Sequence, residues 1–244
     1  ILDTSERQAF LHVNHAPLTA NAVAGHLYTS DMNGTMYALS LPNIQRSPEG
    51  HCAFAKVEGL EGIYLANFVI SNSLFETDTE MGDSMGTEAG SDKSTHNSAS
   101  KSGDTGKVYA QTSITFNKGG EWFLLEPPTK DCFGNVIECA PNAQGKPCRL
   151  HLHGLASDEY GPFYTDARAP GLILATGSVG HYVQQHKGGV NTYASRDGGL
   201  SWVEVFKGSH IYEIGDHGGI IAMAEDAHPT DVLYFSTDEG ATWD

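Results

Sequence analysis

The sequence predicts an all-β fold, a β-propeller whose blades carry Asp-box hairpins. An eight-residue motif recurs after 41 residues, and β-rich runs fall in groups of up to four between turn signals. With 28 glycines, 10 prolines and 39% apolar residues among 244, the chain is too rich in turns for a helical fold and too apolar for a disordered one. A period near 40 residues with four short strands is typical of propeller blades.

The repeated motif is Ser-x-Asp-x-Gly-x-Ser/Thr-Trp, the Asp-box. We expect its Asp to cap a tight turn, its Gly to adopt the positive φ that the turn requires, and its Trp to start the next strand and pack into the sheet. Calcium binding and catalysis by the acid are weaker alternatives than this turn-capping role. The two full copies contain Ser195, Asp197, Gly199 and Trp202, then Ser236, Asp238, Gly240 and Trp243, and a degenerate copy contains Asn117, Gly119 and Trp122. A loose fourth copy spans residues 30–37, with Met32 where the acid belongs.

The strands are expected in four units of one propeller domain, with blades at about 1–41, 54–126, 148–206 and 209–244. The first unit has strands at 8–14, 27–31 and 36–41, and its innermost strand is missing or reduced to the opening residues. The later units have strands at 54–58, 63–70, 111–117 and 122–126, then 148–155, 171–177, 191–196 and 202–206, then 209–215, 219–225 and 232–237.

Three insertions interrupt the blades. Residues 71–107 are rich in Ser, Thr, Gly and Asp and poor in large apolar side chains, so we expect a flexible surface loop. Residues 127–147 form a loop rich in cysteine, and residues 157–170 form a third insertion.

The cysteine loop predicts a disulfide and an oxidising compartment. A zinc site usually shows a tighter Cys-x-x-Cys spacing than this loop has. Cys139 and Cys148 lie nine residues apart, close enough to bridge, whereas Cys52 and Cys132 have no assignable partner. The Asn33-Gly34-Thr35 acceptor sequence predicts glycosylation of Asn33, which fits such a compartment.

The charge balance limits the partners. Lys and Arg number 14 against 30 Asp and Glu, a net charge of −16 that repels nucleic acid and anionic lipid and favours basic partners. No apolar run approaches the ~18 residues of a membrane span. If the protein is secreted or anchored, we expect its signal and its membrane segment outside this chain.

Several stretches together resemble the vacuolar-protein-sorting-ten domain of the sortilin family of sorting receptors, with SorLA, the sortilin-related receptor, as the most similar branch. These stretches are residues 57–64, 148–153, 169–180, 215–221 and 235–243, and the resemblance covers the chain except for residues 71–107. It implies a ten-bladed propeller with a wide tunnel, of which this chain supplies four blades.

The resemblance also implies a function. Such receptors are type I membrane proteins that cycle between Golgi, endosomes and the cell surface. They bind propeptides and other peptide or protein cargo on the luminal or extracellular side, release it at acidic pH, and in some cases dimerise. The resemblance implies no cofactor, no metal and no catalytic residue.

An enzyme remains the alternative because Asp-box propellers include sialidases and other glycosidases. A sialidase needs an arginine cluster, and the five arginines here are scattered; no spacing singles out a pair of glycosidase carboxylates. A scaffold propeller without a sorting role also remains open. A signal peptide, a cysteine-rich module and one membrane segment in the full-length gene would decide for the receptor.

Three histidines lie on or beside the expected innermost strands, His151 and His153 in one blade and His210 in another. The first two alternate on one strand face, but a metal site would need a third ligand that is not evident. We expect all three to gain charge between neutral and endosomal pH and so to weaken the attraction for basic cargo. The alternative is that they fill the interface between blades and titrate without consequence.

Overall fold

The structure is a computed structural model that describes residues 1–14, 24–47, 50–70, 109–155, 163–184 and 189–244. The predicted insertion at 71–107 lies outside these residues. The described part is almost entirely β, and its helical element is a single 3-10 turn, η2 (Asp216–Gly218). The strands are β1 (Phe10–Val13), β2 (Ala24–Ser30), β3 (Tyr37–Gln45), β4 (Phe54–Lys56), β5 (Tyr64–Ile70), β6 (Tyr109–Thr115), β7 (Phe123–Leu124), β8 (Arg149–Leu152), β9 (Tyr164–Thr165), β10 (Ile173–Gly180), β11 (Asn191–Ser195), β12 (Val203–Lys207), β13 (His210–Gly215), β14 (Ile220–Glu225) and β15 (Tyr234–Ser236).

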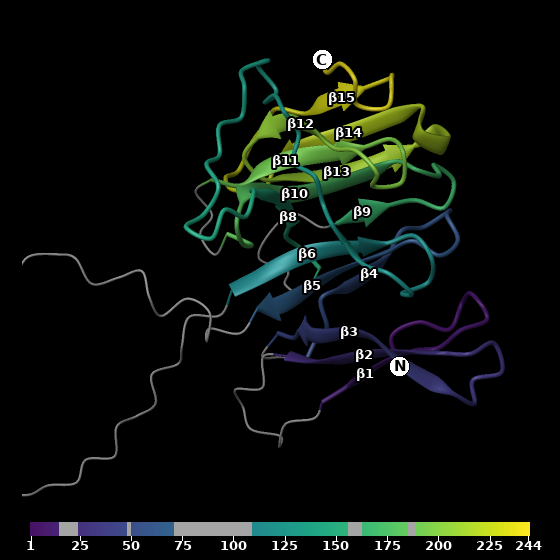
Figure 1. Cartoon of the computed structure of the whole chain (residues 1–244). Coiled ribbons are helices and arrows are strands. Elements are labelled where there is room, and N and C mark those ends of the chain that lie inside the picture. The colour runs from purple at the N-terminus through teal and green to yellow at the C-terminus, as the bar shows by residue number, and fades with distance from the viewer. Residues whose placement is uncertain (15–23, 48–49, 71–108, 156–162, 185–188) are drawn as a thin grey trace, which may run out of the picture.

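These strands pair antiparallel in three sheets that lie one above another (Figure 1). The first sheet has the order β1-β2-β3-β5-β6-β7, with β4 beside β3 on the edge of β5 that is opposite β6. The second has the order β12-β11-β10-β8, with β9 beside β8 on β10, and the third has the order β13-β14-β15. This stack of small antiparallel sheets is the all-β propeller architecture that the sequence predicts.

Several strands differ from the expected bounds by up to three residues, among them β2, β8 and β10, and two larger differences concern β3 and β9. β3 continues to Gln45 and pairs through Ile44 with Phe68, so the first two predicted units share one hydrogen-bonded sheet. Asn43 makes this extension possible, because it adopts φ 57° and donates its backbone N–H to His26 Nδ1 at 3.2 Å. β9 lies inside the predicted insertion at 157–170, where no strand was expected.

The burial patterns show which sheet faces are covered. All the first six residues of β10 are buried, since neighbouring sheets cover both of its faces. In β13, by contrast, buried and exposed residues alternate, so one face packs on the second sheet and the other is open within the described part of the chain. The middle of the stack is therefore its best-packed part.

Three hydrophobic clusters hold the stack together. The lowest joins β1–β3 to β5 through residues such as Phe10, Leu27 and Tyr64. The central cluster joins β5, β6, β8, β10 and β11, and the third joins β10 and β11 to β13 and β14 through Leu174 and Ile221. Since each cluster lies where two groups of strands meet, apolar burial stabilises the packing of one group on the next.

Candidate functional site

The first full Asp-box forms a closed set of hydrogen bonds after β11. The Ser195 hydroxyl accepts the Gly199 N–H at 2.8 Å and donates to Asp197 Oδ1 at 2.8 Å. Asp197 Oδ1 accepts the Ser201 N–H at 2.9 Å, and Asp197 Oδ2 accepts the Ser201 hydroxyl. Trp202 donates its indole N–H to the Gly199 carbonyl at 3.1 Å. The side chains of the four motif residues Ser195, Asp197, Ser201 and Trp202 thus all have hydrogen-bond partners within the hairpin.

The second full copy repeats this geometry after β15. Ser236 accepts the Gly240 N–H at 2.8 Å, and Asp238 accepts both the backbone N–H and the hydroxyl of Thr242, at 2.8 and 2.7 Å. Trp243 donates to the Gly240 carbonyl at 3.1 Å. The motif therefore builds the same turn in two sheets.

The box carboxylates are held in the ionised form. Partial burial alone would raise the pKa of Asp197, but the hydrogen bonds from Ser201 and Ser195 outweigh it and lower the pKa. The pKa of Asp238 falls to about 2, first because the Thr242 backbone donates to it and then because the Thr242 hydroxyl does. Carboxylates engaged in this way serve the turn and are poorly placed as proton donors.

The degenerate copy uses other residues for the same bonds. Thr115 replaces Ser and accepts the Gly119 N–H at 3.0 Å, and Asn117 replaces Asp and accepts the Glu121 N–H at 2.9 Å. Its Trp122 donates to Ser40 Oγ at 3.0 Å, and Ser40 donates in turn to the Gly119 carbonyl. Ser40 lies in β3, so this box also ties two groups of strands together.

The loose fourth copy at 30–37 is not an Asp-box. Asp31 itself is the capping acid: Oδ1 accepts the N–H groups of Thr35 and Met36 at 2.8 and 3.1 Å, while Gly34 donates to the Asp31 carbonyl. The acid therefore stands one position earlier than the alignment with Met32 supposed, and the glycine follows it by three residues instead of two. Asn33 is exposed in this loop, and its glycosylation stays a prediction.

The same tight loop recurs twice in the cysteine loop. Asp131 accepts the Asn135 N–H at 2.8 Å, and Asn142 accepts the Lys146 N–H at 2.9 Å. In both loops the glycine in the fourth position donates to the carbonyl of the capping residue. The chain thus has two kinds of side-chain-capped turn, and only one of them is the Asp-box.

A buried polar cluster joins β5 and β6 to β8. Thr112 Oγ1 donates to Asn67 Oδ1 at 2.6 Å and accepts the Leu152 N–H at 2.8 Å. Asn67 donates to the Leu152 carbonyl at 3.0 Å, and the Thr112 N–H donates to His151 Nδ1 at 3.2 Å. One threonine therefore links the first sheet to the inner strand of the second.

The next interface carries a cluster of the same kind. Thr192 Oγ1 lies 2.9 Å from His210 Nδ1, and Thr176 Oγ1 lies 2.7 Å from the Tyr212 hydroxyl. His210 and Tyr212 belong to β13, whereas both threonines belong to the second sheet. At each of the two interfaces, a threonine thus contacts a histidine of the next group of strands along the chain.

The two clusters occupy equivalent places in the repeat. Thr112 and Thr192 lie 80 residues apart, the same separation as the box residues Thr115 and Ser195. Each faces Nδ1 of a histidine on the inner strand that follows. Sequence reasoning singled out the histidines and missed the threonines, although extending the box alignment three residues upstream would have found them.

Burial changes the expected chemistry of the histidines. Burial lowers the pKa of His151 and of His153 to about 4, and it lowers the pKa of His210 as well. In the packed structure His151 and His153 therefore stay neutral at endosomal pH. The idea that they gain charge there on a tunnel wall needs correction, because they lie 0% and 4% exposed between sheets.

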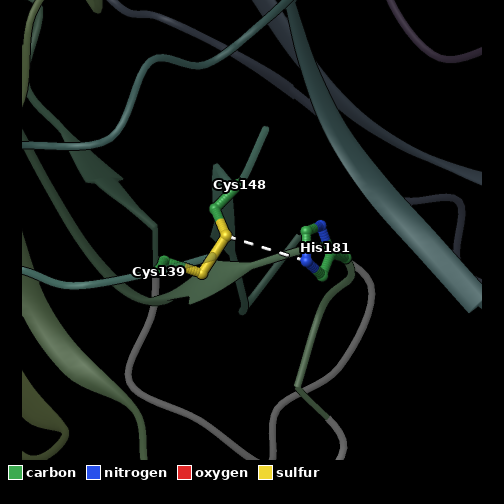
Figure 2. A group of neighbouring side chains, drawn as sticks. All are labelled: Cys139, Cys148 and His181. Atoms are coloured by element: carbon green, nitrogen blue, oxygen red, sulfur yellow. Dashed lines mark hydrogen bonds between the residues drawn. A yellow bond between two sulfur atoms is a disulfide. The ribbon is translucent and has the colours of Figure 1, made fainter. Parts of the chain in front are cut away.

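The cysteine loop contains the disulfide Cys139–Cys148, with His181 beside it (Figure 2). These three residues are the one metal-like cluster among the described residues, but the two sulfur atoms are bonded to each other. Cys52 and Cys132 are free thiols, and burial raises the pKa of both. Within the described part of the chain, no helix is long and apolar enough to span a membrane.

Comparison with known proteins places these features in a family. The family model described as Sortilin-Vps10 (sortilin, neurotensin receptor 3) matches residues 1–244. The chain is 37% identical to vacuolar protein sorting/targeting protein 10 of Talaromyces marneffei, 36% identical to that of Talaromyces stipitatus and 34% identical to that of Candida dubliniensis. Each match covers 100% of this chain and 14% of the relative, so the chain spans about a seventh of their length.

A similarity among solved structures is far weaker. The GH74 enzyme of Niastella koreensis matches 100% of this chain and 41% of its own at 10% identity, with a TM-score of 0.26. A match at that level carries no argument about function.

Proposed function

The chain belongs to the Sortilin-Vps10 family, and from this premise we propose that it forms part of the cargo-binding propeller of a sorting receptor. Its four groups of strands are then successive blades, with the boundaries given above, of a propeller that other segments complete to ten. The cargo is a peptide or a protein bound on the luminal side of the Golgi and endosomes. The name of the relatives, vacuolar protein sorting/targeting protein 10, supports the vacuole as its destination.

One observation carries this proposal: the family match includes every residue of the stacked antiparallel sheets. The inner edges of the blades are the natural place for cargo. Among the described residues, β13 pairs with β14 on one edge and with no strand on the other. An extended peptide can add to such an edge through backbone hydrogen bonds.

The charge of the chain supports basic cargo. The 30 acidic side chains against 14 basic ones attract cationic peptides and raise their association rate at low ionic strength. The Asp-box acids do not contribute a free binding group, since their oxygens are occupied within the turns.

On this proposal, acid releases the cargo by weakening the interfaces between blades. His151 accepts the Thr112 N–H through Nδ1 across its interface and must stay neutral to accept it. His210 Nδ1 instead lies 2.9 Å from Thr192 Oγ1, whose own hydrogen goes to the Gly208 carbonyl, so there the imidazole is the donor. Protonation is resisted by burial and becomes favourable only when the interface opens. Acid therefore weakens the packing of the blades that form the inner edges.

The proposal is tested with the full-length protein and a library of fluorescent basic, neutral and acidic peptides at pH 7.4 and 5.5. We expect saturable binding of basic members at pH 7.4, weaker binding at high salt, and loss of binding at pH 5.5. Binding of no peptide at either pH would favour a scaffold propeller. Turnover of a panel of glycoside substrates would favour the enzyme instead.

A further inference from the structure

We propose that the Cys139–Cys148 bond is a thiol-exchange site, at which a small thiol or a protein dithiol modifies Cys139 and His181 assists the departure of Cys148. The proposal rests on the unequal exposure of the two sulfur-bearing residues, on the position of the histidine, and on what the bond holds in place. It is independent of the identity of the cargo.

The two cysteines differ in their access to solvent. Cys139 lies in the exposed part of the loop, whereas Cys148 is 6% exposed and directly precedes β8. An attacking thiolate must approach the sulfur that it can reach. Cys139 is therefore the residue attacked, and Cys148 is the leaving group.

His181 is placed to stabilise that leaving group. Its Nε2 lies 3.1 Å from the Ala140 carbonyl oxygen and 3.8 Å from Cys148 Sγ (Figure 2). A carbonyl oxygen only accepts hydrogen bonds, so Nε2 carries the hydrogen and can also donate it toward the sulfur. A thiolate that receives a hydrogen bond from a histidine is a better leaving group.

The exchange balances without any further reactant. The thiolate RS⁻ forms an S–S bond with Cys139 while the Cys139–Cys148 bond breaks, and the electron pair of the broken bond stays on Cys148 as a thiolate held by the His181 N–H. A second thiol molecule can then remove the adduct as RSSR and leave two reduced cysteines. The thiol is the reductant in both steps.

Opening this bond releases one part of the cysteine loop and leaves the other in place. Residues 138–147 are exposed except for half-buried Asn142, so the disulfide is their main anchor to β8. The preceding residues stay attached to β12, because Lys207 pairs with Asp131 at 3.3 Å and the Cys132 N–H donates to Glu204 at 3.4 Å. The start of β8, two residues before His151, is then no longer held by the disulfide to the cysteine loop.

The test treats the oxidised full-length protein with glutathione, then traps thiols by alkylation and maps the peptides by mass spectrometry. We expect the glutathione adduct on Cys139 and a free thiol on Cys148. His181→Gln should slow the reduction of this bond roughly three- to tenfold. His228→Gln, which changes an exposed histidine elsewhere, should leave the rate at the wild-type value.

Three results would overturn the proposal: an adduct on Cys148, reduction of His181→Gln at the wild-type rate, or a bond that resists glutathione while the native fold persists. If His181→Gln misfolds, the site of the adduct in the wild type decides alone. Hydrogen exchange adds a second measurement. Reduction should accelerate exchange in residues 138–148 and leave residues 129–137 protected, and equal acceleration in both segments would contradict the mechanism.

Discussion

At the scale of single residues, the carboxylates of the Asp-boxes are engaged in hydrogen bonds within their own turns. Asp197 and Asp238 each bind a hydroxyl and a backbone N–H four residues on, and each also receives the hydroxyl of the Ser two residues before. The degenerate box keeps the turn with Asn117, so the turn needs an acceptor oxygen and not a negative charge.

We expect Asp197→Ala to cost about 1 kcal/mol of stability, as the loss of a capping side chain does at helix N-termini. Asp238→Ala should be destabilising as well. Neither change should alter peptide affinity, which thermal melts and binding measurements on the same full-length preparations would check. Asp197→Asn is the matched control and should retain most of the stability. A variant that melts like the wild type and no longer binds peptide would show that the boxes contact cargo.

A second prediction concerns the residue after the box acid. Gly198, Lys118 and Glu239 occupy this position with φ values of 72°, 59° and 58°, which favour glycine. Glu239→Gly should therefore stabilise its hairpin by about 1 kcal/mol. Gly198→Ala should be destabilising, because the new Cβ would also lie 2.7 Å from Leu60 Cδ1. Local hydrogen exchange in the two hairpins measures both effects, and shifts of the same sign would refute the argument.

At the scale of strands, the boxes made the fold predictable because each marks the end of one strand and the start of the next. β11, β13 and β14 begin and end within one or two residues of the predicted bounds. β9 was not predictable, since two residues have no periodicity and only its pairing with β10 defines it. The extension of β3 depends on the φ of Asn43, and a single residue in a strand-like run gives no such signal.

The candidate site was predictable only in part, for a related reason. The alternation of His151 and His153 placed them on an inner strand, and the structure has His151 in β8 and His153 directly after its end. Their burial and their partners depend on how one sheet stacks on the next. A contact such as that between Thr112 and His151 joins residues 39 apart across two sheets, and neither local pattern nor composition encodes it.

The threonines of the polar clusters support a third prediction. Thr112→Val keeps the shape of the side chain but leaves the Leu152 N–H and Asn67 Oδ1 without the Thr112 hydroxyl. We expect a loss of about 2 kcal/mol, since buried polar groups lose their partners. Ser113→Ala on the same strand is the control, because its hydroxyl makes only a long bond of 3.4 Å to Ala66. Equal destabilisation by both changes, measured by chemical denaturation of the full-length protein, would count against the cluster.

At the scale of the whole molecule, we expect the stability of the interfaces between stacked sheets to depend on pH, because histidines are buried in them. His151 faces Thr112 across its interface and has His153 and His181 near it in its own sheet, and His210 lies near Glu225 and Asp226. Burial lowers the pKa of both histidines and backbone hydrogen bonds partly offset it, but only His210 also has acids, Glu225 and Asp226, that raise its pKa further. The first interface is therefore the more sensitive to acid.

The sign of this sensitivity follows from the pKa values. In the unfolded chain a histidine titrates near 6.5, whereas His151 and His153 in the folded chain titrate at about 4. Between those values the unfolded state binds more protons, so the contribution to stability is complete above pH 6.5 and declines as the pH falls toward 4. Each histidine costs about 1 kcal/mol of stability per pH unit in that window.

We therefore expect acidification from pH 7.4 to 5.5 to open the interface between β6 and β8 before it affects the lowest cluster around Phe10. Hydrogen exchange in β6 and β8, corrected for the intrinsic effect of pH, should accelerate in the full-length wild type. In a His151→Gln/His153→Gln double variant the acceleration should largely disappear, because Gln can replace the acceptor and does not titrate. His228→Gln should behave as the wild type, since that histidine is exposed.

If the double variant keeps the acceleration and also keeps acid release of peptide, other groups of the propeller sense the pH. If it loses both, the packing of these two histidines couples compartment pH to cargo binding.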